Sequence, residues 1–329
     1  MKKIWNWGII GPGNIAHRFA EALLDIPDAC LKGVASRSES RAKSFATKYN
    51  VDKFYSSYAN LASDPDIDIL YISTPHSEHF EHALLGLQHK KAVLCEKPMT
   101  INRQQFLKLR DVAKQNNTFL MEAMWTRFLP TILRVEELVK EGVLGEILKI
   151  DAEFCFKADY DIQKRSFNRQ LAGGSLLDIG IYPLFLSLLL LGNPQYIDAK
   201  AILDPITKVD QTCFMELKFA NGAYANLTSS FMFHRDIKAE IWGTKGNITI
   251  QPKWFAPSYL TLNLLHTKPQ DLEFEYTSNG YDFQALEVMK CLRAGRIESD
   301  LMPHSLSLKL IELLDTIRDK AGIGYPELE

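Results

Sequence analysis

The chain has few cysteines, and none of them form a recognisable pattern. Five occur in 329 residues, at positions 30, 95, 155, 213 and 291. An odd number of scattered cysteines without a C-x-x-C pair gives no sign of a disulfide framework. We therefore expect reduced thiols and a cytoplasmic protein.

Strong net charge and long apolar runs are also lacking. A formal net charge of −2 leaves no electrostatic footprint for nucleic acid and no polybasic patch for a membrane. No apolar run approaches the roughly 18 residues of a membrane span, and residues 184–192 read as a buried helix. The N-terminus has charges but no apolar core of a signal peptide. Internal repeats and low-complexity tracts are absent from the sequence.

An apolar content of 46% and a charged content of 24% are typical of a globular enzyme, and the length suits two domains. In the first third, short apolar segments alternate with helical patterns of about 10–15 residues, which predicts βαβ units and a parallel sheet. The predicted first domain, residues 1–123, is therefore an α/β domain of the Rossmann type.

Beyond residue 123 the pattern changes to strand-like segments with period-2 alternation and turn signals such as Asn221-Gly222. These segments predict an α+β domain, residues 124–329, with a large, mostly antiparallel open sheet and helices on one face. One predicted strand is LEFEYT, residues 272–277, and two closing helices are expected around 282–294 and 304–320.

A glycine-rich turn follows the first predicted strand. Gly11, Gly13 and Ala16 have the G-x-G-x-x-A spacing, which combines a tight turn, close approach to a pyrophosphate and close helix packing. The predicted pyrophosphate-binding residues are Gly11, Gly13, Asn14 and Ile15, at the N-terminus of a helix whose dipole favours an anion.

The end of the second predicted strand indicates which dinucleotide binds. An acidic residue that would read the ribose of NAD is missing there, and Ser36, Arg37, Ser38 and Arg41 stand in its place. Two guanidinium groups and two hydroxyls suit a 2′-phosphate. The segment therefore favours NADP, with NAD possible; a solvated helix start is the alternative interpretation.

Two further segments carry chemistry. Glu96-Lys97-Pro98 places a lysine where a strand leaves the carboxyl edge of the sheet, and the proline is compatible with a cis bond. GGSLLDIGIYP, residues 173–183, places Asp178 and Tyr182 at i and i+4 of an expected helix. A solvated surface lysine is the alternative for Lys97 taken alone.

Together these motifs resemble the glucose-fructose oxidoreductase/inositol dehydrogenase/MocA family of NAD(P)-dependent oxidoreductases over nearly the whole chain. Tyr182 stands where most members have His. That tyrosine, with MEAMWTRFLP (121–130), is similar to the subgroup of dimeric dihydrodiol dehydrogenases and NADP-linked D-xylose dehydrogenases. The resemblance implies a dehydrogenase acting on a secondary alcohol of a diol, cyclic polyol or aldose.

The resemblance also implies residue roles. Tyr182 would exchange the hydroxyl proton, and Lys97 would hydrogen-bond the same oxygen and lower the pKa of the phenol from about 10. Asp178 would orient Lys97 or a substrate hydroxyl, and Glu96 would help place the nicotinamide.

A second group of residues is expected to line the nicotinamide or substrate cleft. Thr74, Pro75 and His76 are predicted to lie beside the cofactor, and the predicted substrate contacts are His79, Phe154, Asp178 and Trp254. The resemblance implies that Trp125 and Arg127 also border the active site. His76, His79 and His82 also form H-x-x-H-x-x-H, but no closing ligand is evident and no metal is predicted. Core packing is the alternative for the aromatic residues.

The resemblance further implies a homodimer through the open face of the C-terminal sheet, because large apolar patches are unusual on monomers. A non-catalytic NADP-binding sensor and a metal-assisted hydrolase or lyase built on the histidines are the two other classes that the sequence leaves open.

Overall fold

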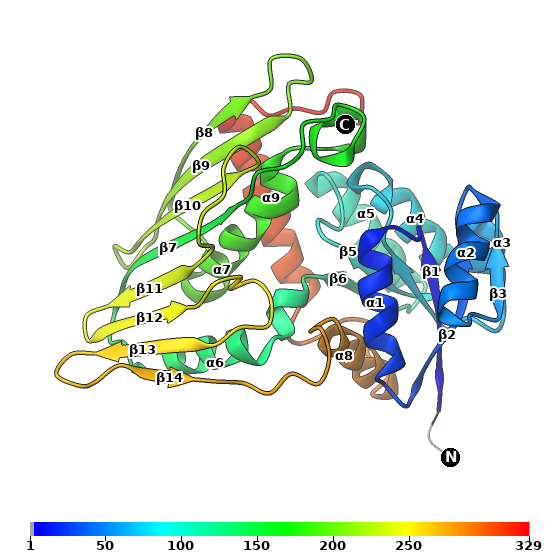
Figure 1. Ribbon diagram of the computed structural model, residues 1–329, viewed down its shortest axis with the longest axis horizontal. Coiled ribbons are helices and arrows are strands. Elements are labelled where there is room, and N and C mark those ends of the chain that lie inside the picture. The colour runs from blue at the N-terminus through cyan, green and yellow to red at the C-terminus, as the bar shows by residue number, and fades with distance from the viewer. Residues whose placement is uncertain (1–2, 329) are drawn as a thin grey trace. The chain divides into compact units, whose positions relative to one another are not determined.

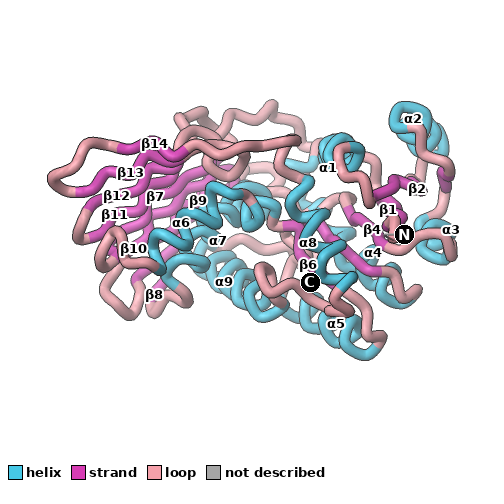
Figure 2. Tube along the Cα trace, turned by 90° about the horizontal axis from the view of Figure 1, so that it is seen from below, coloured by secondary structure: helices cyan, strands magenta, loops and turns pink. Residues whose placement is uncertain are grey.

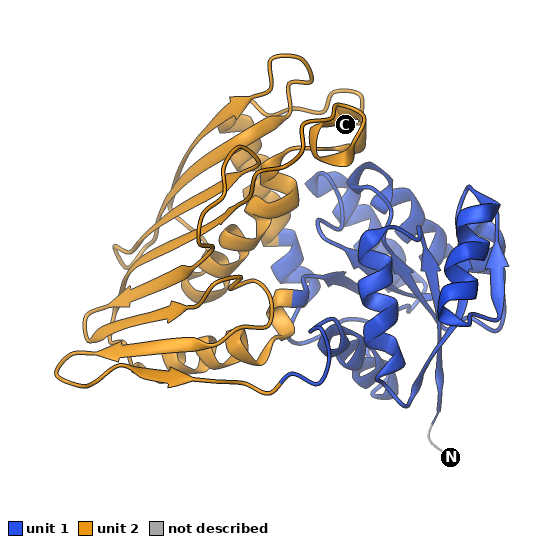
Figure 3. Cartoon of the chain, viewed as in Figure 1, with its two compact units in different colours: residues 1–125, 276–308 blue, residues 126–275, 309–329 orange. Residues whose placement is uncertain are grey.

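The computed structural model describes residues 3–328 and divides into two compact units. Unit 1 holds the chain up to Trp125 together with Tyr276–Leu308, and unit 2 holds Thr126–Glu275 and Lys309–Glu329 (Figure 3). The predicted domain boundary after residue 123 lies two residues from this division. By contacts, residues 276–308 group with unit 1, whereas the sequence analysis placed them in the second domain.

Unit 1 is a parallel α/β layer structure (Figure 1). Its six strands are ordered β3-β2-β1-β4-β5-β6, the doubly wound order in which the direction of the connections reverses beside the first strand. The strands are β1 (Trp5–Ile10), β2 (Ala29–Ala35), β3 (Lys53–Tyr55), β4 (Ile69–Ile72), β5 (Ala92–Glu96) and β6 (Leu120–Ala123). The helices are α1 (Asn14–Leu24), α2 (Glu39–Tyr49), α3 (Tyr58–Ser63), α4 (His76–Gln88), α5 (Arg103–Gln115) and α8 (Asp282–Arg293).

The central strands of unit 1 are apolar because helices cover the sheet. β4 and β5 are buried at every position, as expected of parallel strands enclosed on both faces. Polar side chains cap the N-termini of α2, α3 and α5. Ser38, Ser57 and Asn102 each accept a backbone N–H of the first turn. These caps satisfy amides that have no partner within the helix.

Unit 2 contains an eight-stranded sheet in the order β14-β13-β12-β11-β7-β10-β9-β8. Its only parallel pair among the described residues is β7 with β10; the other neighbours are antiparallel. The strands are β7 (Ile147–Cys155), β8 (Tyr196–Leu203), β9 (Asp210–Lys218), β10 (Tyr224–Ser230), β11 (Ala239–Gly243), β12 (Gly246–Ile250), β13 (Leu260–Leu264) and β14 (Gln270–Leu272). The predicted mostly antiparallel sheet is confirmed.

Helices α6 (Pro130–Lys140), α7 (Ile181–Leu191) and α9 (His304–Ala321) lie along one face of this sheet (Figure 2). The helical stretch Arg169–Leu191 is long and apolar enough to cross a membrane by composition alone. Because 83% of its most apolar window is buried within the protein, the stretch, which ends with α7, belongs to the core of unit 2.

Two local predictions differ from the structure. The strand predicted at 272–277 is mostly loop, because β14 ends at Leu272 and pairs with β13 only through Gln270, Asp271 and Leu272. The helix expected around Asp178 begins with a π turn, Leu176–Gly180, before α7 starts at Ile181. The remaining short elements are 3₁₀ turns at Trp125–Phe128, Arg165–Phe167 and Arg169–Leu171.

Candidate functional site

The turn after β1 has the shape of a pyrophosphate cradle. Gly11 has φ +88°, and a Cβ added there would lie 2.6 Å from Cγ2 of Thr74, so only glycine fits. At Gly13 an added Cβ would meet nothing closer than the Ser73 carbonyl oxygen at 4.0 Å. No side chain caps α1, which begins directly after Gly13. The open space and the uncapped first-turn amides fit a phosphate group.

The predicted 2′-phosphate residues follow β2. Ser36 is buried, and its Oγ accepts the backbone N–H of Ser38 at 3.2 Å. The Ser38 Oγ accepts the backbone N–H of Arg41 and so caps α2. The Arg37 guanidinium is exposed and lies 3.3 Å from a carboxylate oxygen of Glu78. Arg41 is exposed on the first turn of α2. Both guanidinium groups are thus accessible at the end of β2.

The segment after β4 is fixed by histidines of α4. Thr74 is buried, and its Oγ1 lies 3.0 Å from Nδ1 of His82. His79 is buried with Nε2 2.8 Å from the Thr74 carbonyl and Nδ1 2.8 Å from the Pro98 carbonyl. Burial lowers the pKa of His79 to about 4, although the two carbonyls act in the opposite sense. The neutral ring has one N–H, so it donates to only one of the two carbonyls at a time. His79 thus contacts the loops after β4 and β5, and its substrate contact stays a prediction.

Glu96 and Lys97 lie at the carboxyl end of β5, and both side chains are buried. The Tyr71 hydroxyl donates to a carboxylate oxygen of Glu96, and the Lys97–Pro98 peptide is cis. Glu122 of β6, which the sequence analysis missed, accepts the Met99 N–H at 2.9 Å. Burial raises the pKa of Glu122, while Lys97 nearby acts in the opposite sense. The loop that carries Lys97 is thus held from two neighbouring strands.

In unit 2, Asp178 lies in the π turn and is paired with an arginine that the sequence analysis did not identify. Arg165 contacts both carboxylate oxygens of Asp178, with Nη1–Oδ1 2.7 Å and Nη2–Oδ2 2.9 Å. Such a bidentate pair holds the carboxylate in a defined orientation. Arg165 lies in a short 3₁₀ turn, and neither its position nor its neighbours form a recognisable motif.

Tyr182 lies in the first turn of α7 within a group of aromatic rings. Its ring centroid is 5.6 Å from that of Phe154 and 5.5 Å from that of Phe255, and these two phenylalanines stack at 3.9 Å. Trp254 is fully buried and donates its indole N–H to the Glu153 carbonyl at 2.9 Å. Phe255, which the sequence analysis missed, is therefore a ring neighbour of Tyr182. The substrate contacts of Phe154 and Trp254 stay predictions.

The remaining predicted substrate contacts have partners within their own units. Trp125 stacks on Tyr281 in unit 1, with centroids 4.2 Å apart and planes nearly parallel. In unit 2 the buried Arg127 pairs with Glu136 of α6, with N–O 3.0 Å. The proposed roles of Trp125 and Arg127 at a substrate remain predictions.

Most of the predicted residues form two groups. One follows the carboxyl ends of β1, β2, β4 and β5 in unit 1; the other lies on β7, in the π turn and at the start of α7 in unit 2. Trp125, Arg127 and Trp254 belong to neither group, because they lie in the turn after β6 and in the loop after β12. Within residues 3–328 no three His, Cys, Asp or Glu side chains are arranged to hold a metal ion.

A parallel sheet in this order, with a glycine turn after β1 and a buried lysine after β5, defines a dinucleotide-binding α/β protein. The chain belongs to the GFO/IDH/MocA oxidoreductase family. The model of the family's NAD-binding Rossmann fold matches residues 5–124, and that of its C-terminal domain matches residues 132–249. The resemblance stated from the motifs is confirmed, and so is the fold class.

Curated relatives carry the name trans-1,2-dihydrobenzene-1,2-diol dehydrogenase. The Mus musculus protein is 36% identical over 98% of both chains, and the Homo sapiens protein is 33% identical over the same shares. A 3-ketoreductase from Actinomadura kijaniata, solved with NADP and TDP-benzene, has TM-score 0.89 and 25% identity, covering 97% of this chain and 98% of its own. An aldose-aldose oxidoreductase from Caulobacter crescentus, solved with glycerol, has TM-score 0.88, 25% identity and the same coverage.

Proposed function

We propose that the protein is an NADP-dependent dehydrogenase acting on a secondary alcohol of a diol, cyclic polyol or aldose. The observation that carries this proposal is the buried Lys97 at the carboxyl end of β5, on the same sheet edge as the open Gly11–Gly13 turn. The names of the relatives support the substrate class, since they include a dihydrodiol dehydrogenase and an aldose oxidoreductase.

Removing two hydrogens from a secondary alcohol takes a hydride from carbon and a proton from oxygen. The nicotinamide, when bound, supplies the hydride chemistry. Tyr182 takes the hydroxyl proton in the oxidising direction and returns it in the reducing direction. The Lys97 ammonium group donates to the same substrate oxygen and favours the phenolate form of Tyr182. The aromatic rings of Phe154 and Phe255 restrict water around the phenol.

Other residues orient the reactants in this proposal. Asp178, held by Arg165, orients a substrate hydroxyl or Lys97, while Glu96 and the Thr74-Pro75-His76 segment place the nicotinamide ring. Arg37 and Arg41 bind the adenosine 2′-phosphate, which requires the Arg37 guanidinium to exchange Glu78 for the phosphate. The NADP-bound relative from Actinomadura kijaniata supports this cofactor choice.

The test is a pair of variants, Lys97→Met and Tyr182→Phe, assayed by NADPH absorbance with a panel of dihydrodiols, inositols and aldoses and repeated with NAD. Each variant is expected to lose 10²–10⁴-fold in kcat, the usual size of a general acid–base contribution. Lys114→Met and Tyr160→Phe are matched controls, since both side chains are exposed, and both are expected to turn over normally.

Near-native kcat in both Lys97→Met and Tyr182→Phe would contradict the residue assignment. Tight NADPH binding by the wild type with no turnover across the whole panel would instead favour the non-catalytic sensor.

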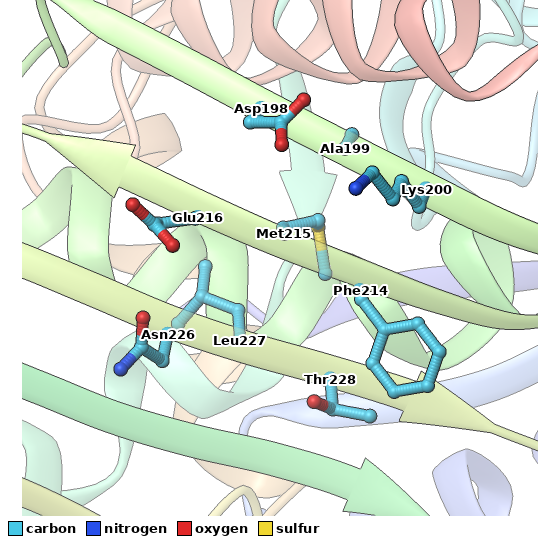
Figure 4. A pocket seen from close by; sticks show the side chains of 9 residues that line it. All are labelled: Asp198, Ala199, Lys200, Phe214, Met215, Glu216, Asn226, Leu227 and Thr228. Carbon is cyan, nitrogen blue, oxygen red and sulfur yellow. The ribbon is translucent and has the colours of Figure 1, made fainter.

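The proposal includes a homodimer and a reducing compartment. The face of the unit 2 sheet opposite its helices exposes large apolar side chains: Tyr196, Ile202, Phe214, Tyr224 and Trp242. A hollow on this face is lined by residues of β8, β9 and β10, among them Lys200, Phe214 and Glu216 (Figure 4). A second copy seated here would cover this surface.

All five cysteines are free thiols, which suits the cytoplasm.

A further inference from the structure

A buried carboxylic acid stands at the base of the helix that carries Tyr182. Asp210, at the start of β9, is completely buried. Its Oδ2 accepts the Ser175 hydroxyl at 2.8 Å and the Leu176 backbone N–H at 2.7 Å. Its Oδ1 has no hydrogen-bond partner among the described residues. None of the chemical roles assigned above uses this group.

Asp210 belongs to β9 and caps the N-terminal end of the π turn. Ser175 occupies the N-cap position of Leu176–Gly180, but its own side chain makes no capping bond to the turn. The first amides of a helix need an acceptor, and Asp210 supplies it for Leu176. A carboxylate at this end is also favoured by the helix dipole. The contact therefore fixes where the turn begins.

Two glycines of the motif around Asp178 make this arrangement possible. Gly174 has φ +115°, and an added Cβ would lie 2.1 Å from Oδ1 of Asp210. At Gly180 an added Cβ would lie 2.8 Å from the Ser229 hydroxyl, which in turn lies 2.9 Å from the Ser175 hydroxyl. The polar cluster of Asp210, Ser175 and Ser229 thus touches both ends of the π turn, and each contact requires a glycine opposite it.

The π turn determines the positions of two proposed reactive groups. Asp178 lies inside it, and Tyr182 lies two residues after it in α7. A π turn has i→i+5 hydrogen bonds in place of i→i+4 bonds. The residues after it therefore lie on other faces of the helix than they would in a regular α-helix. Asp210 is fully buried, so water does not compete for its bonds to Ser175 and Leu176. Burial raises the pKa of Asp210 to about 7, and the same two bonds act in the opposite sense.

We propose that Asp210 is a positioning residue for the reaction: through Ser175 and Leu176 it holds the π turn that orients Asp178 and Tyr182. The catalytic consequence rests on the proposed dehydrogenase function, whereas the structural consequence does not.

The experiment compares Asp210→Asn, Asp210→Ala and Ser175→Ala with the control Asp204→Asn. Asp204 is also buried, and its hydrogen-bond partners Ile206, Thr207 and Gln211 lie outside the π turn. For each variant the melting temperature, NADPH affinity, kcat and KM are measured, together with amide hydrogen exchange of a peptide spanning 175–186.

Asp210→Ala is expected to lower kcat at least tenfold and to raise amide exchange in 175–186 at least tenfold, with NADPH affinity unchanged. Asp210→Asn, which keeps one acceptor oxygen, and Ser175→Ala are expected to lie between Asp210→Ala and the wild type. Asp204→Asn is expected to lower the melting temperature without a selective change in 175–186 or in kcat.

The proposal is overturned if the Asp210 and Ser175 variants differ from Asp204→Asn in neither exchange nor kcat. Ser175→Ala keeps the buried carboxyl in place, so it decides the question if an Asp210 variant fails to fold. A wild type without turnover would refute the dehydrogenase function, while the exchange of 175–186 would still test Asp210.

Discussion

At the scale of single residues, the positions of the functional side chains depend on contacts with residues far away in the sequence. Arg37 follows β2, yet its guanidinium contacts Glu78 of α4. Arg165 and Asp178 are thirteen residues apart and meet as a bidentate pair. The ring nitrogens of His79 face carbonyls of two loops that hold predicted cofactor residues. The chemistry of each residue type was readable from the sequence, but these pairings depend on the fold.

The cofactor preference can be tested with Arg37→Ala and Arg41→Ala. Each is expected to weaken NADPH binding about tenfold, because a hydrogen bond between charged groups contributes about 1.5–3 kcal/mol, reduced here by solvent exposure. NADH binding should change little, since it has no 2′-phosphate. Dissociation constants from NAD(P)H fluorescence measure both.

Lys48→Ala is the matched control for the arginine variants. Lys48 is exposed on the last turn of α2, the helix that also carries Arg41. Equal losses for NADPH and NADH in the arginine variants would contradict the 2′-phosphate role.

At the scale of elements, one charged network joins β3 to the segment that follows α3. The buried carboxylate of Asp64, just after α3, accepts from Lys53 at 2.8 Å, from the Tyr55 hydroxyl and from the backbone N–H of Asp66 at 2.9 Å. Burial alone would raise the pKa of Asp64, but these donors outweigh it and lower the pKa to about 2. The network adds polar contacts to β3, which has only three residues, none of them buried.

Asp64→Asn is therefore expected to lower the free energy of unfolding by about 1–2 kcal/mol at pH 7. Because the folded pKa lies below the ordinary value near 3.8, the contribution is complete above about pH 4 to 5. It is lost as the pH falls toward 2. Urea unfolding of both proteins between pH 7 and pH 3 should show the difference shrinking.

Asp66→Asn serves as the control for that series. Asp66 also contacts Lys53, at 2.7 Å, but its side chain is 57% exposed, so the loss should stay below about 1 kcal/mol. An equal loss in the two variants, or a difference that grows at low pH, would refute the assigned role of Asp64.

At the scale of the whole molecule, the open face of the unit 2 sheet is the feature that a single chain leaves uncovered. Antiparallel sheets tolerate a solvated face, yet this one mixes charged residues such as Lys200 and Glu216 with large exposed rings such as Phe214 and Trp242. Exposed apolar surface of this kind is commonly an association site.

We expect the protein to be a dimer in light scattering at micromolar concentration and Phe214→Asp to convert it to a monomer. A buried charge opposite an apolar partner surface is costly, so one substitution at this 45% exposed ring is sufficient. Leu24→Asp, at an exposed apolar position on α1, should leave the mass unchanged. A strictly monomeric wild type would eliminate this interface.

The sequence by itself determined the features that depend on local spacing. The spacing of the apolar residues predicted the parallel and the antiparallel sheet, and the spacing of Gly11 and Gly13 predicted the cofactor turn. Both predictions were possible because backbone conformation and strand burial depend on a few neighbouring residues. The family resemblance followed from a few such motifs.

Only the tertiary structure decided how distant side chains meet. It paired Asp178 with Arg165, brought Phe255 beside Tyr182, and placed the carboxyl of Asp210 under a π turn that a regular i,i+4 spacing did not predict. Each contact joins segments from different strands or loops, and its geometry depends on the packing of whole elements rather than on any local pattern. The glycines at 174 and 180 were visible in the sequence, but the groups that require them were not.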